Sequence, residues 1–82
     1  MNLQDVLNKV CDGMSDNKTS QKLGINRVTF SNYRNERKIP DDEILNRMIE
    51  LSGLDPVEVY LAAYAEKVKH PKVAEAFRHF GA

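Results

Sequence analysis

The sequence lacks the features that would place it in a membrane or among disulfide-bonded proteins. Its 82 residues include a single cysteine, so no internal disulfide can form, which favours a reducing cytoplasm. No apolar run approaches the roughly 20 residues that are needed to cross a bilayer. The first ten residues contain Asp5 and Lys9 where a signal peptide would need an unbroken apolar stretch. We therefore expect a small cytoplasmic protein.

The chain also lacks net charge, because 12 basic residues balance 12 acidic ones. The two signs are nevertheless unevenly distributed. Residues 18–38 contain six basic residues and one acidic residue, whereas residues 39–66 contain one basic residue and seven acidic ones. Residues 67–82 are basic again. A basic block inside a balanced chain predicts an anionic partner.

No alternating strand pattern is present, and apolar residues recur at helical spacing between breaks. The pattern predicts an all-α fold of five or six short helices. They are expected over residues 3–10, 16–23, 27–35, 42–51, 56–68 and 73–80. The expected N-caps are Asn2, Ser15, Asn26, Asp41 or Asp42, and Asp55.

Residues 16–34 have the pattern of two helices joined by a very short turn, which describes a helix-turn-helix. Gly24 lies at the turn, and the small Ser20 lies where the two helices must approach closely. Four residues fall where buried side chains are needed, namely Leu23, Ile25, Phe30 and Tyr33. The residues between them are left facing outward: Arg27, Val28, Thr29, Ser31, Asn32 and Arg34.

This segment resembles the λ-repressor-like (Cro and repressor, XRE-type) helix-turn-helix family, and the chain is similar to small repressors of filamentous prophages. The resemblance covers residues 2–61, including the loop 34–40 with its proline and the helix end at residues 52–54. The chain departs from the family at Thr19 and Ser20, where leucine and alanine are usual, and at Glu36, where glycine is usual. The resemblance implies a helix-turn-helix domain over residues 1–61 and a helical C-terminal extension over residues 62–82.

The resemblance further implies that residues 27–34 lie in the major groove of double-stranded DNA. Arg27 could donate two hydrogen bonds to guanine, and Asn32 could pair with adenine in the analogous way. Val28 and the methyl group of Thr29 could touch a thymine methyl. The expected phosphate contacts are Ser15, Asn17, Lys22, Ser31, Tyr33, Arg34, Arg37 and Lys38.

Three of the residues in this region have competing interpretations. Arg34 could instead pair with Glu36 or Asp41 on the protein surface. Tyr33 is more readily a core residue than a DNA contact. Asp16 stands where related repressors often have a glutamine on the DNA backbone, but a carboxylate there would repel phosphate. We therefore expect no DNA contact from Asp16.

Repressors of this family read two-fold-related half-sites as dimers, so the resemblance implies a homodimer on a palindromic operator. The expected interface consists of Val59, Tyr60, Ala63, Val73, Phe77 and Phe80. The predicted function is that of a sequence-specific transcriptional regulator, a phage or prophage repressor. Two alternatives stay open at this point: an antitoxin or other protein-interaction module on the same fold, and a DNA-bending accessory factor for recombination.

No catalytic or metal-binding pattern is found in the sequence. His70 and His79 have no zinc-type spacing, and Cys11 fits a small core hydrophobe. Three consecutive acidic residues, 41–43, are explained by their place at the start of a helix. The sequence also has no phosphate-binding glycine loop and no nucleophile motif. We therefore expect a protein that is not an enzyme and that has no cofactor and no small-molecule substrate.

Overall fold

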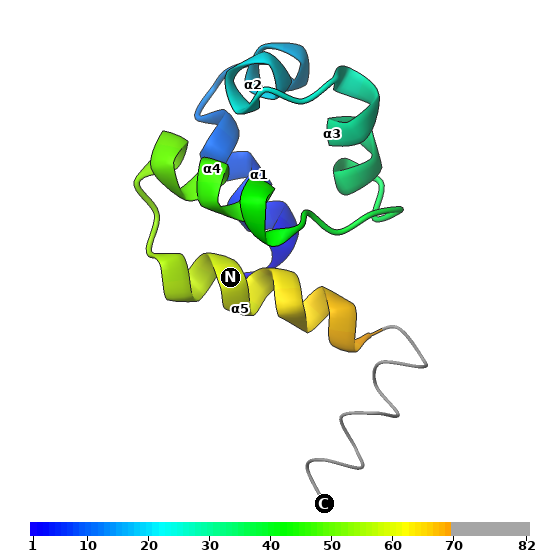
Figure 1. Cartoon of the computed structure of the whole chain (residues 1–82), viewed down its shortest axis with the longest axis vertical. Helices are drawn as coiled ribbons and strands as arrows, with labels where there is room; N and C mark the ends of the chain where they lie inside the picture. Colours follow the sequence, from blue (N-terminus) through cyan, green and yellow to red (C-terminus); the bar gives the residue numbers. More distant parts are fainter. Residues whose placement is uncertain (70–82) are drawn as a thin grey trace, which may run out of the picture.

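Five helices follow one another in the computed structural model, which describes residues 1–69 (Figure 1). They are α1 (Leu3–Cys11), α2 (Asp16–Leu23), α3 (Arg27–Arg34), α4 (Asp42–Ser52) and α5 (Pro56–Val68). These residues contain no strand, so the predicted all-α class is confirmed for them. The helix expected over residues 73–80 lies outside the described residues. No helix within residues 1–69 is long and apolar enough to cross a membrane.

The helix starts follow from side-chain caps that the sequence predicted. The side chain of Asn2 accepts a hydrogen bond from the Asp5 amide at 2.8 Å, and the Asp5 carboxylate accepts one from the Asn2 amide at 3.1 Å. Single side-chain caps at Ser15, Asn26 and Asp41 begin α2, α3 and α4. Helix α5 has no side-chain cap bond at its start and instead begins with Pro56, whose fixed φ suits that position.

Helices α2 and α4 end at glycines with left-handed backbone, and one residue of the loop after α3 adopts the same conformation. Gly24 and Gly53 end α2 and α4 with φ of 73° and 72°. Glu36, in the loop after α3, has a φ of 60°. Its backbone therefore adopts the left-handed conformation that favours glycine, at the position where the family that the sequence resembles usually has one.

The two glycine caps provide a matched pair of stability tests. A Cβ added to Gly53 meets nothing within 4 Å, whereas one added to Gly24 lies 3.2 Å from Nη1 of Arg47. That atom donates a hydrogen bond to the Leu23 carbonyl at 3.0 Å. Gly53→Ala is expected to lower the free energy of unfolding by about 1 kcal/mol, the backbone strain alone. Gly24→Ala is expected to lower the free energy of unfolding further, because the Arg47 guanidinium must also move. Urea denaturation measures both losses, and equal losses would contradict this expectation.

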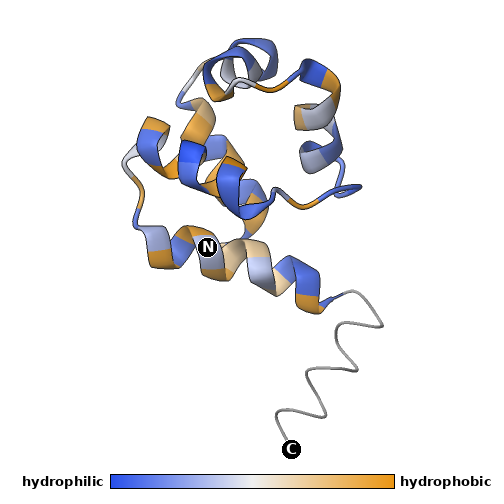
Figure 2. Ribbon diagram, in the orientation of Figure 1, coloured by the Kyte–Doolittle hydropathy of each residue, from blue (hydrophilic) through white to orange (hydrophobic). Residues whose placement is uncertain are grey.

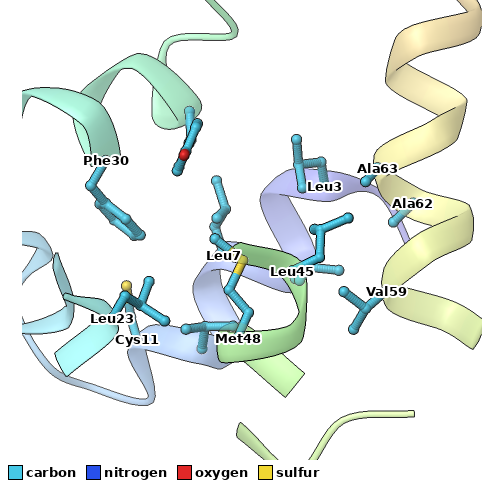
Figure 3. Packing of buried hydrophobic residues seen from close by; sticks show 13 residues of the cluster. Leu3, Leu7, Cys11, Leu23, Phe30, Leu45, Met48, Val59, Ala62 and Ala63 are labelled. Carbon is cyan, nitrogen blue, oxygen red and sulfur yellow. The ribbon is translucent and has the colours of Figure 1, made fainter. Parts of the chain in front are cut away.

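Helix α1 is the centre of the hydrophobic core and packs against α2, α4 and α5. Its buried residues are Leu3, Val6, Leu7, Val10 and Cys11. Figure 3 shows Leu3 and Leu45 on the side of the cluster that faces α5, and Phe30 reaching into the opposite side from α3. The small Ala62 and Ala63 of α5 are buried there too, which lets that helix lie close to the rest of the core.

Two buried hydroxyl residues of α2 stand where the family that the sequence resembles usually has leucine and alanine. Thr19 is 0% exposed and Ser20 is 1% exposed. Each hydroxyl donates to a carbonyl in the preceding turn, Thr19 to Ser15 at 2.9 Å and Ser20 to Asn17 at 2.6 Å. The polar atoms are therefore satisfied, and burying them leaves no unpaired group.

The predicted dimer interface is wrong for two of its residues on α5. Val59 and Ala63 are both 0% exposed, because they lie on the face of the helix that packs into the core of their own chain. Tyr60 is half-buried, and its hydroxyl donates to Asn46 at 2.6 Å. Val73, Phe77 and Phe80 lie outside the described residues. Helix α5 is continuous across residues 61 and 62, the boundary that was expected between the domain and its extension.

Candidate nucleic-acid interface

The α2–α3 pair is held together by a three-residue turn and by side chains that point inward. Gly24, Ile25 and Asn26 separate the helices, and the Ile25 amide donates to the Ser20 carbonyl at 3.0 Å. Ile25 packs against the core. On α3, Phe30 and Tyr33 are 0% and 5% exposed, respectively. These two aromatic side chains fix which face of α3 points inward and leave the opposite face in solvent.

Residues on the outer face of α3 line a shallow hollow. Val28 is 67% exposed, Arg27 and Ser31 are also exposed, and Asn32 is half-buried. These four residues line a hollow of about 390 Å³, together with Asp16 from the start of α2 and Arg37 from the loop after α3. Three of the four predicted base contacts thus lie around one space. Thr29, the fourth, is half-buried and does not line the hollow, whereas Ser31, a predicted phosphate contact, does.

The loop after α3 is fastened to the backbone of the last turn of the helix. The amides of Arg37 and Lys38 both donate to the carbonyl of Asn32, at 2.9 and 3.3 Å. Both side chains are exposed, as is that of Arg27. Within residues 1–69 the ion pairs are Arg34–Asp16, Arg47–Glu43 and Lys69–Glu66. The cations at positions 27, 37 and 38 are therefore unpaired in that part of the chain.

Arg34 does not have the surroundings expected of a phosphate contact. Its guanidinium donates to Asn8 Oδ1 at 2.6 Å, to Cys11 Sγ at 3.2 Å and to Asp16 Oδ1 at 3.3 Å. The guanidinium carbon also lies 5.6 Å from the centre of the Phe30 ring, at cation–π distance. Only 22% of the side chain is exposed. Arg34 thus joins α3 to α1 and α2, and its carboxylate partner is Asp16, not Glu36 or Asp41 as in the competing interpretation of the sequence.

Tyr33 is a core residue in the structure. Its ring packs edge-on against Phe30 with centroids 6.4 Å apart, and its carbonyl accepts a hydrogen bond from the Gln4 side chain at 3.0 Å. Burial raises the pKa of the Tyr33 phenol, and the charge of Asp41 raises it further. The structure therefore favours the core interpretation of Tyr33 over contact with a phosphate.

The remaining predicted phosphate contacts lie on the surface of α2 and its cap. Asn17 and Lys22 are exposed, and so is Ser15. The Ser15 hydroxyl already accepts a hydrogen bond from the Lys18 amide at 3.1 Å, which leaves its proton free for another acceptor. Ser31 is in a similar state, since its hydroxyl accepts from Asn35 Nδ2 at 3.1 Å.

No group of three or more His, Cys, Asp or Glu side chains is arranged to hold a metal ion within residues 1–69. His70 and His79 lie outside the described residues. Cys11 is a free, buried cysteine, in agreement with its predicted place in the core.

A second surface, an apolar strip on α5, shares only Tyr60 with the dimer interface that was expected from the sequence. Val57 and Leu61 are 63% and 65% exposed, and Tyr64 is 41% exposed. With Pro56 and Tyr60 they line a hollow of about 360 Å³. Figure 2 shows apolar residues on the side of α5 that is turned away from the other helices. We call these five residues the α5 strip.

Two tyrosines of the α5 strip are fixed by polar contacts with α4. The Tyr64 hydroxyl donates to Asp42 Oδ1 at 3.1 Å, and this hydrogen bond raises the pKa of Tyr64. The rings of Tyr60 and Tyr64 pack edge-on with centroids 5.8 Å apart. The strip therefore has a defined shape, although it is exposed.

Comparison of the chain with known proteins gave no match to a family model, a curated protein or a solved structure.

Proposed function

We propose that this protein is a sequence-specific DNA-binding regulator with a λ-repressor-like helix-turn-helix, which binds a palindromic operator as a homodimer. The observation that carries the proposal is the two-sided character of α3. Its inner face holds two buried aromatic residues, while its outer face presents polar side chains around one hollow. A recognition helix needs this division, because the inner face fixes it to the scaffold and the outer face meets base edges.

In this proposal α3 enters the major groove, where each base pair presents a distinct set of donors, acceptors and methyl groups. Arg27 donates two hydrogen bonds to guanine O6 and N7, and Asn32 pairs with adenine. Val28, which is 67% exposed, is well placed for a thymine methyl. Arg37 and Lys38 contact phosphates beside the groove, since their amides are bonded to the same helix.

The uneven charge supports specific rather than general binding of DNA. Most of the α2–α3 pair lies in the basic block of residues 18–38, whereas α4 and most of α5 lie in the acidic block of residues 39–66. Non-specific affinity for DNA grows with the number of phosphates that a protein neutralises. The acidic helices lower this non-specific affinity, so that base contacts contribute a larger share of the total affinity for DNA.

The second copy is proposed to bind at the α5 strip. Helix α5 is apolar on two faces: Val59, Ala62 and Ala63 are buried in its own chain, while the strip is exposed. A helix that is apolar all round is normally covered on all sides. The helix has Asp55 and Glu58 near its start and Lys67 and Lys69 near its end. Antiparallel pairing about a two-fold axis places the acidic end of each helix beside the basic end of the other.

The proposed function is tested by selecting bound sequences from a pool of random DNA duplexes. The expected outcome is an enriched palindrome, whose half-sites are separated by about one helical turn. The affinity for the selected duplex is then compared with that for a random duplex at physiological salt. Equal affinity for the two would rule out sequence-specific regulation.

Two substitutions on the proposed interface should weaken DNA binding in different ways. Arg27→Ala is expected to cost about 1–3 kcal/mol of binding free energy and to relax the preference at one base position of each half-site. Lys38→Ala is the matched control, because it also removes one positive charge but from a side chain that does not line the hollow. It should weaken binding to all sequences alike and reduce the slope of log K against log salt by about 1 per subunit. Identical effects of both variants on base preference would contradict the assignment.

A protein-interaction module is the second candidate function, and the α5 strip is the observation that favours it. On that alternative the strip binds a different protein, such as a toxin, instead of a second copy. Sedimentation at micromolar concentration distinguishes the two. A monomer that also selects no DNA sequence would favour the interaction module, whereas a dimer that selects a palindrome favours the regulator.

A further inference from the structure

Asp16, the first residue of α2, lies beside the outer face of α3. Its side chain lines the same hollow as Arg27, Val28, Ser31 and Asn32, the residues around which base contact is proposed. The Asp16 side chain is 52% exposed. A carboxylate at this position was expected only to repel DNA, and the structure gives a reason to reconsider that expectation.

The charge of Asp16 is compensated by a cation that is fixed in place. Its Oδ1 atom accepts hydrogen bonds from Arg34 Nη2 at 3.3 Å and from the Cys11 thiol at 3.7 Å. Arg34 is itself held by Asn8 on α1 and lies against the Phe30 ring. The other carboxylate oxygen, Oδ2, has no hydrogen-bond partner within residues 1–69. One acceptor thus stays free in a half-exposed position.

The electrostatic surroundings of that free oxygen are positive. Arg27 and Arg37 line the hollow with Asp16, and Arg34 pairs with it from the side. A lone carboxylate would be repelled by DNA phosphates, but one that is paired with a guanidinium group, in a hollow that two further arginines line, adds less repulsion. The carboxylate can then approach a base edge and act as a hydrogen-bond acceptor.

We propose that Asp16 is a specificity-determining residue, whose free oxygen accepts a hydrogen bond from the N4 amino group of cytosine in the major groove. This inference rests on the proposed DNA-binding function. Cytosine presents only an amino donor there, whereas adenine presents the N7 acceptor beside its amino group, guanine presents two acceptors, and thymine presents an acceptor and a methyl group. A carboxylate therefore favours cytosine over the other bases. Sequence recognition accordingly comes from the first residue of α2 as well as from α3.

Arg34 acts as a positioning residue in this arrangement. It touches no base, but it pairs with Oδ1 and leaves Oδ2 as the free acceptor. Its contacts with Asn8 and Phe30 keep it from moving to a phosphate. The same guanidinium lowers the repulsion that Asp16 would otherwise exert on DNA.

The test compares the wild-type protein with Asp16→Asn and Asp16→Ala in selection from random duplexes, followed by affinity measurements on the selected sites. Wild-type protein is expected to prefer cytosine at one base pair of each half-site by about tenfold. Asp16→Asn carries an amide that can bond adenine N6 and N7 together, so the preference there should change to adenine. Asp16→Ala should lose the preference at that pair and keep it at the others.

Three outcomes overturn the inference without affecting the proposed function. If both variants keep the base preferences of wild type and bind all DNA more tightly, Asp16 only repels phosphate. If both keep those preferences but melt at lower temperature and bind all sites more weakly, its role is only structural. If wild-type protein selects a palindrome but prefers cytosine at no base pair where the variants alter the preference, Asp16 reads no base. A wild-type protein that selects no sequence contradicts the proposed function itself.

A control on the DNA side uses only wild-type protein and Asp16→Ala. Replacing the preferred C·G pair by T·A removes the amino group from the contacted base. Binding by wild type should fall about tenfold, while binding by Asp16→Ala should not change. An equal loss for both proteins would show that another residue reads the pair.

Discussion

Phe30→Ala is expected to lower the free energy of unfolding by about 3–5 kcal/mol, the largest stability effect of any single side chain on the α2–α3 pair. Phe30 is 0% exposed and is the largest fully buried side chain of the described residues. Its ring packs against Tyr33 and lies beneath the Arg34 guanidinium. Removing it leaves a cavity and also releases the contacts that orient α3.

The loss would be a large part of the total stability of so small a protein. Domains have about 0.05–0.15 kcal/mol of stability per residue, so 82 residues correspond to roughly 4–12 kcal/mol. Urea denaturation followed by far-ultraviolet circular dichroism gives the change directly. Val28→Ala is the matched control on the exposed side of α3 and should alter stability by less than about 0.5 kcal/mol. A Phe30→Ala protein within about 1 kcal/mol of wild type would contradict this account of the core.

Leu61→Glu is expected to dissociate the proposed homodimer, with a loss of dimer affinity of at least about 100-fold. In a two-fold interface each substitution acts twice, so two leucines leave the contact and two carboxylates enter it. Leu61 is 65% exposed in the single chain, so the fold itself should be almost unaffected. Operator binding should weaken strongly, because each subunit then binds its half-site without a partner subunit on the other half-site.

The measurement is sedimentation equilibrium across a range of protein concentrations, with DNA titration of the same samples. Leu51→Glu is a suitable control, since Leu51 is a partly exposed leucine, 37% exposed, on α4 and outside the α5 strip. It should leave the oligomeric state unchanged. Should wild-type protein be monomeric at micromolar concentration with and without DNA, the homodimer is excluded.

The helices were predictable because their starts and ends depend on neighbouring residues. Asn2, Ser15 and Asn26 cap the helices that follow them, and these caps can be recognised within three or four residues of sequence. The inward orientation of Phe30 was predictable for the same reason, since the helical period and the turn at Gly24 fix it. The end of α3 came one residue earlier than expected and the ends of α1 and α4 one residue later, which is the usual uncertainty of helix ends.

Contacts between distant segments were not predictable in the same way. Arg34 had acidic neighbours at Glu36 and Asp41, but its partner is Asp16, 18 positions away. Only the packing of α1, α2 and α3 brings those two groups together. On α5 the apolar residues were assigned to the wrong face, because Val59 and Ala63 were expected in a dimer interface and are buried in their own chain. The inner face proved to be the one with Ala62 and Ala63, because small side chains allow the helix to lie close to α1.

The two hydrogen bonds from the loop to the Asn32 carbonyl have a consequence for the thermodynamics of association. Because the amides of Arg37 and Lys38 are tied to the backbone of Asn32, this part of the loop is already ordered before any ligand arrives. Little conformational entropy is then lost from this backbone when a complex forms, so more of the contact energy appears as affinity. The spacing between the loop and α3 is also set in advance. In the proposed complex, a duplex whose groove does not match that spacing would itself have to deform, and the energy of that deformation would discriminate among DNA sequences through their stiffness.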